Sequence, residues 1–525
     1  MRELVVLSSI AGRSLGPSRR RVKVVLGRTA LGALPLAALF LAVVLPAGGI
    51  ARAGHFDGLY GQDPYAYLDY ATGPLVDSLR HFTPPPPFYW PPGYPLLLAL
   101  TSFAIGNGPL AGQIVSLLAG GLVPVFTALL AGEVWSEGFL KHPDASAARL
   151  EAPAVSLMAG LVAAFAGQLW QSSVVVMADT TGLALATLGV WALVRYRRRA
   201  RLGWLCLAAV ALAGAILTRW AYALVAIPCA VYAAVALARQ IRRQALLHLG
   251  SVVVVAGLLL GPLLVPALGA LLAGGTGAAP FATDLQVYSW SPLNAARRSF
   301  VTADGVLSYS LPNGLYYALA PARPYYFTPL VAWLILPGLG SVARRCTPSS
   351  LLIVGWAAIV FAFHAGAPWQ NFRFTLAYLP PLAILVALGA VSVWRRTEQF
   401  RPPLARTALP LGLAVGLGWM AASGAALTRG FVDRKDADLA TVAWLTQRLP
   451  VNAVVFTFGF TLTLRHYGGV ETVDMSATDP AAVADRLRRG QPTYLFVDEE
   501  NLETQWRGQT PEVVYRSLRD GPGLA

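Results

Sequence analysis

The sequence predicts an all-α polytopic membrane protein with about eleven transmembrane helices and a small extracytoplasmic α/β domain at its C-terminus. Hydrophobic residues make up 56% of the 525 residues and charged residues only 13%, whereas soluble domains carry about a quarter charged residues. Several stretches of 17 or more residues contain no charge, and about 20 apolar residues span a bilayer as a helix. A soluble enzyme is therefore excluded.

Apolar runs bounded by charged or turn residues define the expected membrane spans. They cover residues 29–50, 109–131, 152–171, 178–194, 202–218, 220–238, 249–272, 326–343, 349–364, 374–394 and 406–428. The first run is longer than the apolar core of a signal peptide, which has about 7 to 15 residues. We therefore interpret it as a retained first helix.

The net charge of +15 is concentrated in short basic clusters between the apolar runs. The clusters lie at 195–201, 239–243 and 344–345, and Arg13, Arg19, Arg20, Arg21, Lys23 and Arg28 precede the first run. Such clusters are typical of cytoplasmic loops, whereas nucleic-acid binding requires a basic stripe or face. We expect a multi-pass protein of the cytoplasmic membrane with its N-terminus inside, its C-terminus outside and no nucleic-acid partner.

One apolar segment, Pro92 to Gly106, is shorter than the roughly 20 residues of a typical membrane span. If it crossed the membrane, the arginine clusters at 195, 239, 344 and 395 would all lie outside, against the positive-inside rule. Short apolar segments are more often interfacial or re-entrant. We therefore interpret this segment as a juxtamembrane or re-entrant helix.

This topology divides the chain into a basic cytoplasmic N-terminus (1–28), a transmembrane domain (29–428) and an extracytoplasmic domain (429–525). Two long outer loops, 51–108 and 273–325, belong to the transmembrane domain. In the C-terminal domain, the residue patterns predict helices at 436–450 and 479–490 and strands at 453–458 and 493–498.

Polar residues stand at the expected outer ends of three helices, namely Asp179, Arg219 and Arg373. Such residues are functional candidates because burying them in a membrane is costly. Both arginines lie on the side that the positive-inside rule disfavours, and a guanidinium can hold a phosphate with two parallel hydrogen bonds. The alternatives are arginines that reach lipid headgroups and an aspartate that caps its helix.

The first outer loop contains the sequence HFDGLYGQDPYAYLDYATGPL. It resembles the first loop of the GT-C superfamily of integral-membrane glycosyltransferases, especially the branch of the protein O-mannosyltransferases and lipid A aminoarabinose transferases. The motif Asp-Glu-x-x-Tyr-x-x-x-Ala of that branch is matched by Asp63, Tyr67 and Ala71. Pro64 replaces the second acid of the motif.

Further segments resemble the same superfamily, in the same order, over residues 30 to 430. PPGYP at 91–95 is similar to the segment that enters a membrane-embedded helix. MADTT with Asp179 resembles the acidic start of the fourth helix, and LTRWAY with Arg219 resembles a threonine-arginine turn. NFRF with Arg373 is similar to a late arginine-aromatic segment that precedes a proline-rich helix.

The resemblance implies a glycosyltransferase that moves a sugar from a polyprenyl-phosphate donor to an acceptor hydroxyl or amine at the outer face of the membrane, with inversion. It implies Asp63 as the general base, with Asp57 as the alternative, and Arg373 and Arg219 as ligands of the donor phosphate. The further substrate-binding candidates are Tyr67, Asp179, Tyr94 and His364. The acceptor would be an envelope glycan, lipid or protein, and membrane lipids would surround the chain.

No cofactor is assigned from the sequence, and a divalent metal ion stays open without a ligand motif to support it. Three other functions also stay open. A lipid or solute transporter would place polar groups nearer the membrane midplane, an oligosaccharyltransferase-like enzyme would carry a Trp-Trp-Asp signature that the tail lacks, and a non-catalytic envelope-assembly subunit could retain the fold.

Overall fold

The computed structural model describes residues 17–137, 145–238, 240–272, 289–302, 305–400, 403–476, 478 and 491–520. Some predictions fall outside these ranges. They concern Arg13, Arg239, the helix at 479–490 and parts of the second outer loop (273–288 and 303–304).

The described chain is mostly helical, in agreement with the predicted fold class. Its first part contains α1 (Pro17–Ala53), α2 (Asp63–Tyr70), the π-helical turn η1 (Ala71–Leu75), α3 (Val76–His81), α4 (Gly93–Ile105), α5 (Leu110–Glu137), α6 (Ala145–Ala164), α7 (Gly167–Val174), α8 (Asp179–Arg199), α9 (Leu202–Thr218), η2 (Trp220–Tyr222), α10 (Ala223–Leu237) and α11 (Arg242–Leu272). Its second part contains η3 (Pro292–Ala296), β1 (Ser299–Thr302), β2 (Gly305–Ser308), α13 (Asn313–Leu319), η4 (Ala320–Ala322), α14 (Thr328–Ala332), α15 (Ile335–Arg345), α16 (Pro348–Gly366), α17 (Phe372–Thr375), η5 (Leu376–Tyr378), α18 (Leu379–Phe400), α19 (Pro403–Thr446), β3 (Val454–Thr457), α20 (Thr461–Gly468), β4 (Glu471–Asp474), β5 (Thr493–Phe496), α22 (Glu499–Thr504) and α23 (Thr510–Arg519).

Seven described helices are long and apolar enough to cross a membrane, or eight if α6 and α7, which bend by 59° at their junction, form one span. The predicted count of eleven is not confirmed. The remaining predicted spans correspond to α8, to α9 with only 17 residues, and to the separate helices α14 and α15. α8 falls short in apolar character because it starts with Asp179 and ends in the arginines of its last turn.

The two ends of the helix bundle differ in chemistry, and α8 connects them. Its 21 residues correspond to a length of about 30 Å. The arginines at its C-terminal end pair with acidic residues of α5, and the arginine near the end of α18 pairs with the start of α6. These pairs are Arg195 and Arg198 with Glu133, Arg197 with Glu137, and Arg395 with Glu151. The basic clusters at 195–199 and 395 therefore lie at the end opposite Asp179.

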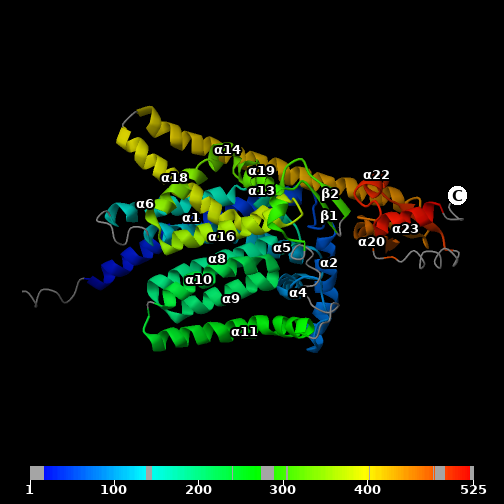
Figure 1. Cartoon of the computed structure of the whole chain (residues 1–525), viewed down its shortest axis with the longest axis horizontal. Coiled ribbons are helices and arrows are strands. Elements are labelled where there is room, and N and C mark those ends of the chain that lie inside the picture. The colour runs from blue at the N-terminus through cyan, green and yellow to red at the C-terminus, as the bar shows by residue number, and fades with distance from the viewer. Residues whose placement is uncertain are drawn as a thin grey trace, which may run out of the picture.

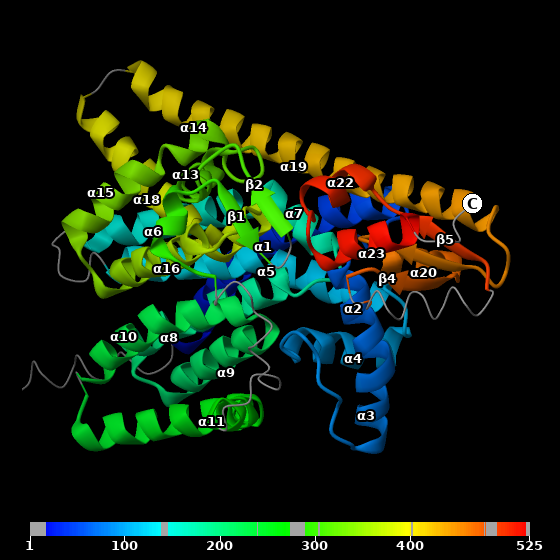
Figure 2. The same ribbon diagram turned by 45° about the vertical axis from the view of Figure 1, so that its right-hand side comes forward.

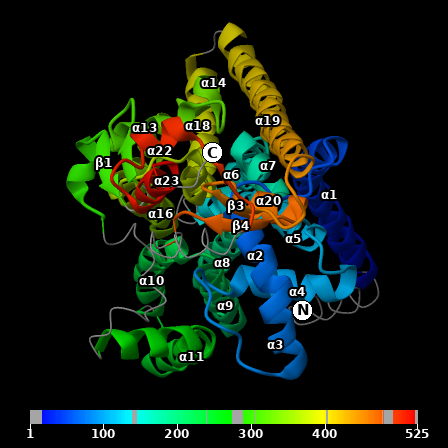
Figure 3. The ribbon, with the colours of Figure 1, turned by 90° about the vertical axis from the view of Figure 1, so that its right-hand side faces the viewer.

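At the other end, α2 and α3 run across the direction of the long helices (Figure 1). α4 follows them and has 13 residues, about 20 Å in length. This is shorter than a membrane span requires, and Figure 3 shows α4 running across a view along the longest axis of the molecule. α4 is thus a short apolar helix near the end of the bundle, as the distribution of arginines indicates.

The C-terminal elements lie beyond the same end of the bundle (Figures 1 and 2). β3 is the central strand of a parallel three-stranded sheet in the order β4–β3–β5, with Val454 opposite both Glu471 and Thr493. β3 and β5 fall at the two predicted strands, whereas β4 was not predicted. The expected domain boundary after residue 428 lies within α19, a continuous helix of 44 residues, so the division into domains stays a prediction.

Candidate active site

Asp63 is the first residue of α2, at the end of the bundle that faces the C-terminal elements. The residue before the helix is Gln62, and no side chain caps the first turn. Asp63 is therefore the first helical residue and does not cap the helix. Pro64 occupies the first turn, where its missing N–H is tolerated. The Asp63 side chain keeps 37% of its surface exposed and is available for contacts with other segments.

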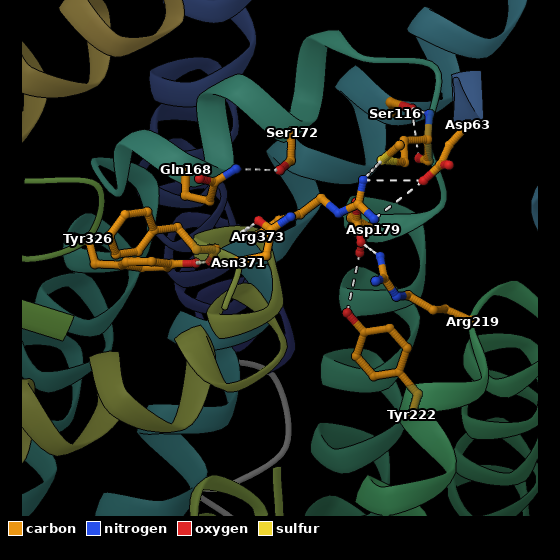
Figure 4. A network of polar contacts seen from close by, with 12 residues as sticks. Asp63, Ser116, Gln168, Ser172, Asp179, Arg219, Tyr222, Tyr326, Asn371 and Arg373 are labelled. Carbon is orange, nitrogen blue, oxygen red and sulfur yellow. Dashed lines mark hydrogen bonds and ion pairs between the residues drawn. The ribbon is translucent and has the colours of Figure 1, made fainter. Parts of the chain in front are cut away.

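Arg373 belongs to the short helix α17, which interrupts the chain before α18. The Asn371 side chain accepts a hydrogen bond from the Arg373 N–H at 2.9 Å, as an N-cap does. The Tyr326 hydroxyl donates to the Phe372 carbonyl at 2.5 Å. These two contacts fix the turn and direct the arginine side chain toward α2 and α8 (Figure 4).

The guanidinium of Arg373 connects three segments that are far apart in the sequence. Its two terminal nitrogens both lie 3.4 Å from one carboxylate oxygen of Asp63. One of them also lies 3.0 Å from the sulfur of Met177, and Nε lies 3.5 Å from Asp179. Both carboxylate contacts are long for charge-assisted hydrogen bonds. Of the two carboxylates, Asp63 is the more exposed, so a competing anion could replace it at the Arg373 guanidinium.

Asp179 lies between two guanidinium groups (Figure 4). One carboxylate oxygen pairs with Arg219, and the other faces Nε of Arg373. Only 5% of the Asp179 side chain is exposed, and a buried carboxylate requires such compensation. α8 starts at Asp179 with no side-chain cap bond, so the capping alternative is wrong and the carboxylate instead holds both arginines.

Aromatic rings surround the arginine pair. The Phe374 ring centre lies 5.6 Å from the guanidinium carbon of Arg219 and 5.7 Å from that of Arg373, within the range of cation–π attraction. The buried His364 stacks with Phe374 at 5.2 Å between ring centres. His364 therefore lies in the aromatic layer beside the arginines. Neither of its ring nitrogens has a hydrogen-bond partner in the described chain.

Tyr67 lies on α2 and is buried against Trp90, with ring centres 4.7 Å apart in a stacked arrangement. Burial raises the pKa of the Tyr67 phenol, while the positive charge of Arg219 acts in the opposite direction. The phenol is therefore neutral at physiological pH and can donate a hydrogen bond. It lies beside Arg219 and Asp63, and its substrate-binding role stays a prediction.

Tyr94 has a different position from the one expected of a substrate-binding residue. Its side chain is fully buried, and its hydroxyl contacts the Gly112 carbonyl at 3.1 Å and the Ser116 hydroxyl at 2.9 Å. Ser116 in turn donates to the Met177 carbonyl at 3.1 Å. Through Ser116, Tyr94 thus supports the segment that carries Met177, whose sulfur contacts Arg373. The Tyr94 hydroxyl is already hydrogen-bonded within the bundle.

The PPGYP segment owes its position to a glycine. A Cβ at Gly93 would lie 2.6 Å from the carbonyl oxygen of Leu217, closer than real Cβ atoms approach. The start of α4 therefore contacts the backbone of the α9 end directly, two residues before Arg219. This close approach explains why the motif has glycine at position 93.

Asp57 does not join the arginine cluster. One carboxylate oxygen accepts the Leu59 N–H at 3.0 Å, and the other accepts the hydroxyl of Tyr467 from α20. The alternative base therefore contacts the C-terminal elements, while Asp63 contacts Arg373.

Sequence reasoning missed several neighbours of the candidate residues. They are Gln62, Ser116, Met177 and Phe374. Gln62 and Phe374 are sequence neighbours of the candidates Asp63 and Arg373, whereas Ser116 had no such local signal. In the ranges that the structure describes, no group of three or more His, Cys, Asp or Glu side chains could hold a metal ion.

Fold and site together define a multi-pass membrane protein with a carboxylate–arginine cluster at one end of its helices. The structure is similar to that of ArnT from Cupriavidus metallidurans in the apo state, with a TM-score of 0.61, 14% identity and coverage of 92% of this chain and 95% of that one. ArnT bound to undecaprenyl phosphate gives a TM-score of 0.57. The oligosaccharyltransferase AglB from Archaeoglobus fulgidus also gives 0.57, with 12% identity and coverage of 89% and 70%.

The sequence comparisons reach a shorter segment. The curated undecaprenyl phosphate-α-4-amino-4-deoxy-L-arabinose arabinosyl transferase of Pseudomonas savastanoi pv. phaseolicola is 33% identical over 115 residues. The match spans 20% of this chain and 19% of that protein. No family model matches the sequence. The resemblance to the GT-C superfamily is thus confirmed at the level of the fold.

Proposed function

We propose that the chain is a glycosyltransferase that moves a sugar from a polyprenyl-phosphate donor to an acceptor hydroxyl or amine, with inversion. The observation that carries the proposal is the contact of Arg373 with both Asp63 and Asp179, completed by Arg219 on the second oxygen of Asp179. This cluster offers one accessible carboxylate and two guanidinium groups. The proposal also agrees with the donor named for the matched transferase and with the lipid bound to ArnT.

The roles follow from the chemistry of the reaction. A polyprenyl phosphate leaves as an anion, which requires positive charge but no proton, whereas the acceptor must lose one proton. The acceptor oxygen or nitrogen bonds to the anomeric carbon, and its proton passes to Asp63. The bond between that carbon and the phosphate oxygen breaks, and its electron pair leaves with the phosphate, which Arg373 and Arg219 stabilise.

The free protein holds Asp63 against Arg373, so donor binding must change this contact. A phosphate that takes the paired hydrogen bonds of the Arg373 guanidinium would release the Asp63 carboxylate toward the acceptor. Asp179 keeps both arginines in place during this exchange because it is buried and contacts Arg219 with one carboxylate oxygen and Arg373 with the other. Tyr67 and His364 would contact the sugar or the acceptor.

We place the cluster at the outer face of the cytoplasmic membrane, with the N-terminus inside. The basic clusters at the far end of α8 support this orientation through the positive-inside rule. Acceptor identity stays open among an envelope glycan, a lipid and a protein. The complete topology, including α8, α9 and α14–α15 as membrane helices, is part of the same proposal.

The test uses the purified chain in lipid nanodiscs with a panel of labelled polyprenyl-phosphate sugars and an envelope extract. We expect label to move to an acceptor and free polyprenyl phosphate to form in equal amount. The matched control is Asp63→Asn, which preserves side-chain size but cannot take a proton. Donor that stays intact in every combination would refute the proposed glycosyltransferase activity. Movement of intact donor across the membrane of proteoliposomes would favour a transporter.

A further inference from the structure

Lys435 is a buried cation that the proposed reaction does not use. It lies on α19, near the end of that helix that reaches the C-terminal elements, and only 2% of its surface is exposed. Its ammonium donates to the Leu59 carbonyl at 2.6 Å and to the Tyr65 hydroxyl at 2.9 Å. It also lies 3.9 Å from the ring centre of Tyr467.

The two hydrogen-bond partners of this ammonium are neutral groups, while the carboxylates of Asp57 and Asp438 lie close enough to favour its positive charge. Burial raises the pKa of the Tyr65 phenol to about 12, so its oxygen is a neutral acceptor at physiological pH. Burying an ammonium is costly, and here two hydrogen bonds and the nearby carboxylates offset that cost. An apolar side chain of similar length could fill the space but could not make the hydrogen bonds to Leu59 and Tyr65.

The partners of Lys435 belong to the segment that carries Asp63. Leu59 precedes α2, and Tyr65 is the third residue of this helix. Residues two apart on an α-helix point in directions about 160° apart, close to opposite. Lys435 therefore holds α2 on the side opposite the one from which Asp63 contacts Arg373.

Two further contacts attach the same segment to the C-terminal elements. The Tyr467 hydroxyl donates to Asp57, and the Gln62 side chain donates to the Gly459 carbonyl at 2.6 Å. Gln62 directly precedes Asp63. The start of α2 is thus held by α19, by α20 and by the turn after β3.

We propose that Lys435 is a positioning residue that fixes α2 through Tyr65 and Leu59, and thereby sets the Asp63 carboxylate against Arg373. This inference rests on the proposed function for its effect on turnover. A misplacement of about 1 Å at a reacting group can cost a hundredfold in rate. Loss of the ammonium should therefore lower kcat, while the donor KM changes little because Arg373 and Arg219 are held by Asp179.

The experiment compares Lys435→Met, Lys435→Arg and the matched control Arg434→Met, an exposed position next to it on α19. All variants are purified at full length in nanodiscs. We expect kcat to fall about tenfold to a hundredfold in Lys435→Met, with partial recovery in Lys435→Arg and no change in Arg434→Met. In the Asp63→Asn background, Lys435→Met should cost nothing further, since the group that it positions is already disabled.

Hydrogen exchange of the α2 amides gives a readout that does not depend on turnover. Residues 63–70 should exchange faster in Lys435→Met, and Tyr65→Phe, which removes one acceptor, should give a smaller increase. Unchanged exchange in α2, or an undiminished loss of rate when Lys435→Met is added to Asp63→Asn, would overturn the inference. If α2 exchanges faster in Lys435→Met but the wild-type chain shows no transferase activity, the contact stands and the proposed function is refuted.

Discussion

The guanidinium of Arg373 lies 3.4 Å from the carboxylate of Asp63, although 310 positions separate the two residues in the chain. The first comes from the turn before α18 and the second from the start of α2. Their contact brings the expected phosphate ligand and the expected base to one place. It also makes the roles of the two residues separable, because a substitution can remove the proton acceptor without removing the guanidinium.

Asp63→Asn should leave a folded protein that binds donor but transfers sugar at least about a hundredfold more slowly, the lower end of what general acid–base catalysis contributes. Structure supports normal folding because Asp63 makes no capping bond. Initial rates and donor binding are measured side by side. A fully active Asp63→Asn variant would contradict the assignment of the base.

Asp57→Asn should act on stability rather than on chemistry. Asp57 contacts Tyr467 and the Leu59 N–H, and an amide oxygen can still accept one of these bonds. We expect a lower melting temperature and a rate within a few-fold of wild type. A well-folded but inactive Asp57→Asn would move the base to this residue.

Arg373→Ala should lower kcat/KM by about 2 to 4 kcal/mol in transition-state stabilisation, as for other preorganised charge contacts. Arg373→Lys should retain part of the activity because the ammonium keeps the charge but cannot form two parallel hydrogen bonds. Steady-state kinetics with varied donor concentration distinguishes the two. Equal rates in Arg373→Ala and wild type would show that this arginine has no role in transfer.

Arg219→Leu should destabilise the protein by about 3 kcal/mol or more, because it removes one partner from the buried carboxylate of Asp179. Adding Asp179→Asn should restore part of the stability, since the uncompensated charge disappears. Thermal unfolding in detergent of the two single variants and the double variant gives the coupling. Strictly additive losses would contradict the pairing.

Gly93→Ala should displace α4 from the end of α9 and cost about 1 to 3 kcal/mol. The added Cβ would lie 2.6 Å from the Leu217 carbonyl oxygen, whereas a Cβ at Gly203 on α9 would meet nothing within 4 Å. Gly203→Ala is therefore the matched control and should not reduce stability. Similar melting temperatures for both variants would argue against a close approach at Gly93.

The sequence was sufficient to predict the regions of helix and the ends of the bundle. Long uncharged runs specify helices through local chemistry, and arginine clusters mark one end of them. The bend between α6 and α7 and the separation of α14 from α15 were not predictable, because continuous apolar runs there carry no signal that distinguishes one helix from two. The same limitation explains part of the difference from the predicted count of eleven spans, and the charged ends of α8 and the 17-residue length of α9 explain the rest.

Part of the site was also accessible from the sequence. Asp179, Arg219 and Arg373 attracted attention because charge at the end of an apolar run is costly. Met177 and Tyr94 could not be assigned their positions in this way, since an apolar or aromatic residue next to a charged one is common. Lys435 had no distinguishing feature, as it lies among other charged residues in RKDAD. Its burial depends on contacts with Leu59, Tyr65 and Tyr467, which are distant in the sequence.

The uninterrupted course of α19 has a geometric consequence. Its 44 residues extend over about 66 Å, from the basic end of the bundle to the C-terminal sheet. Inserting one residue before Lys435 would rotate everything beyond it by about 100° and advance it by about 1.5 Å, which would turn the ammonium away from Tyr65. An insertion that a surface loop would absorb is therefore not tolerated here, so the length of this helix in residues is constrained as strictly as the identity of the lysine.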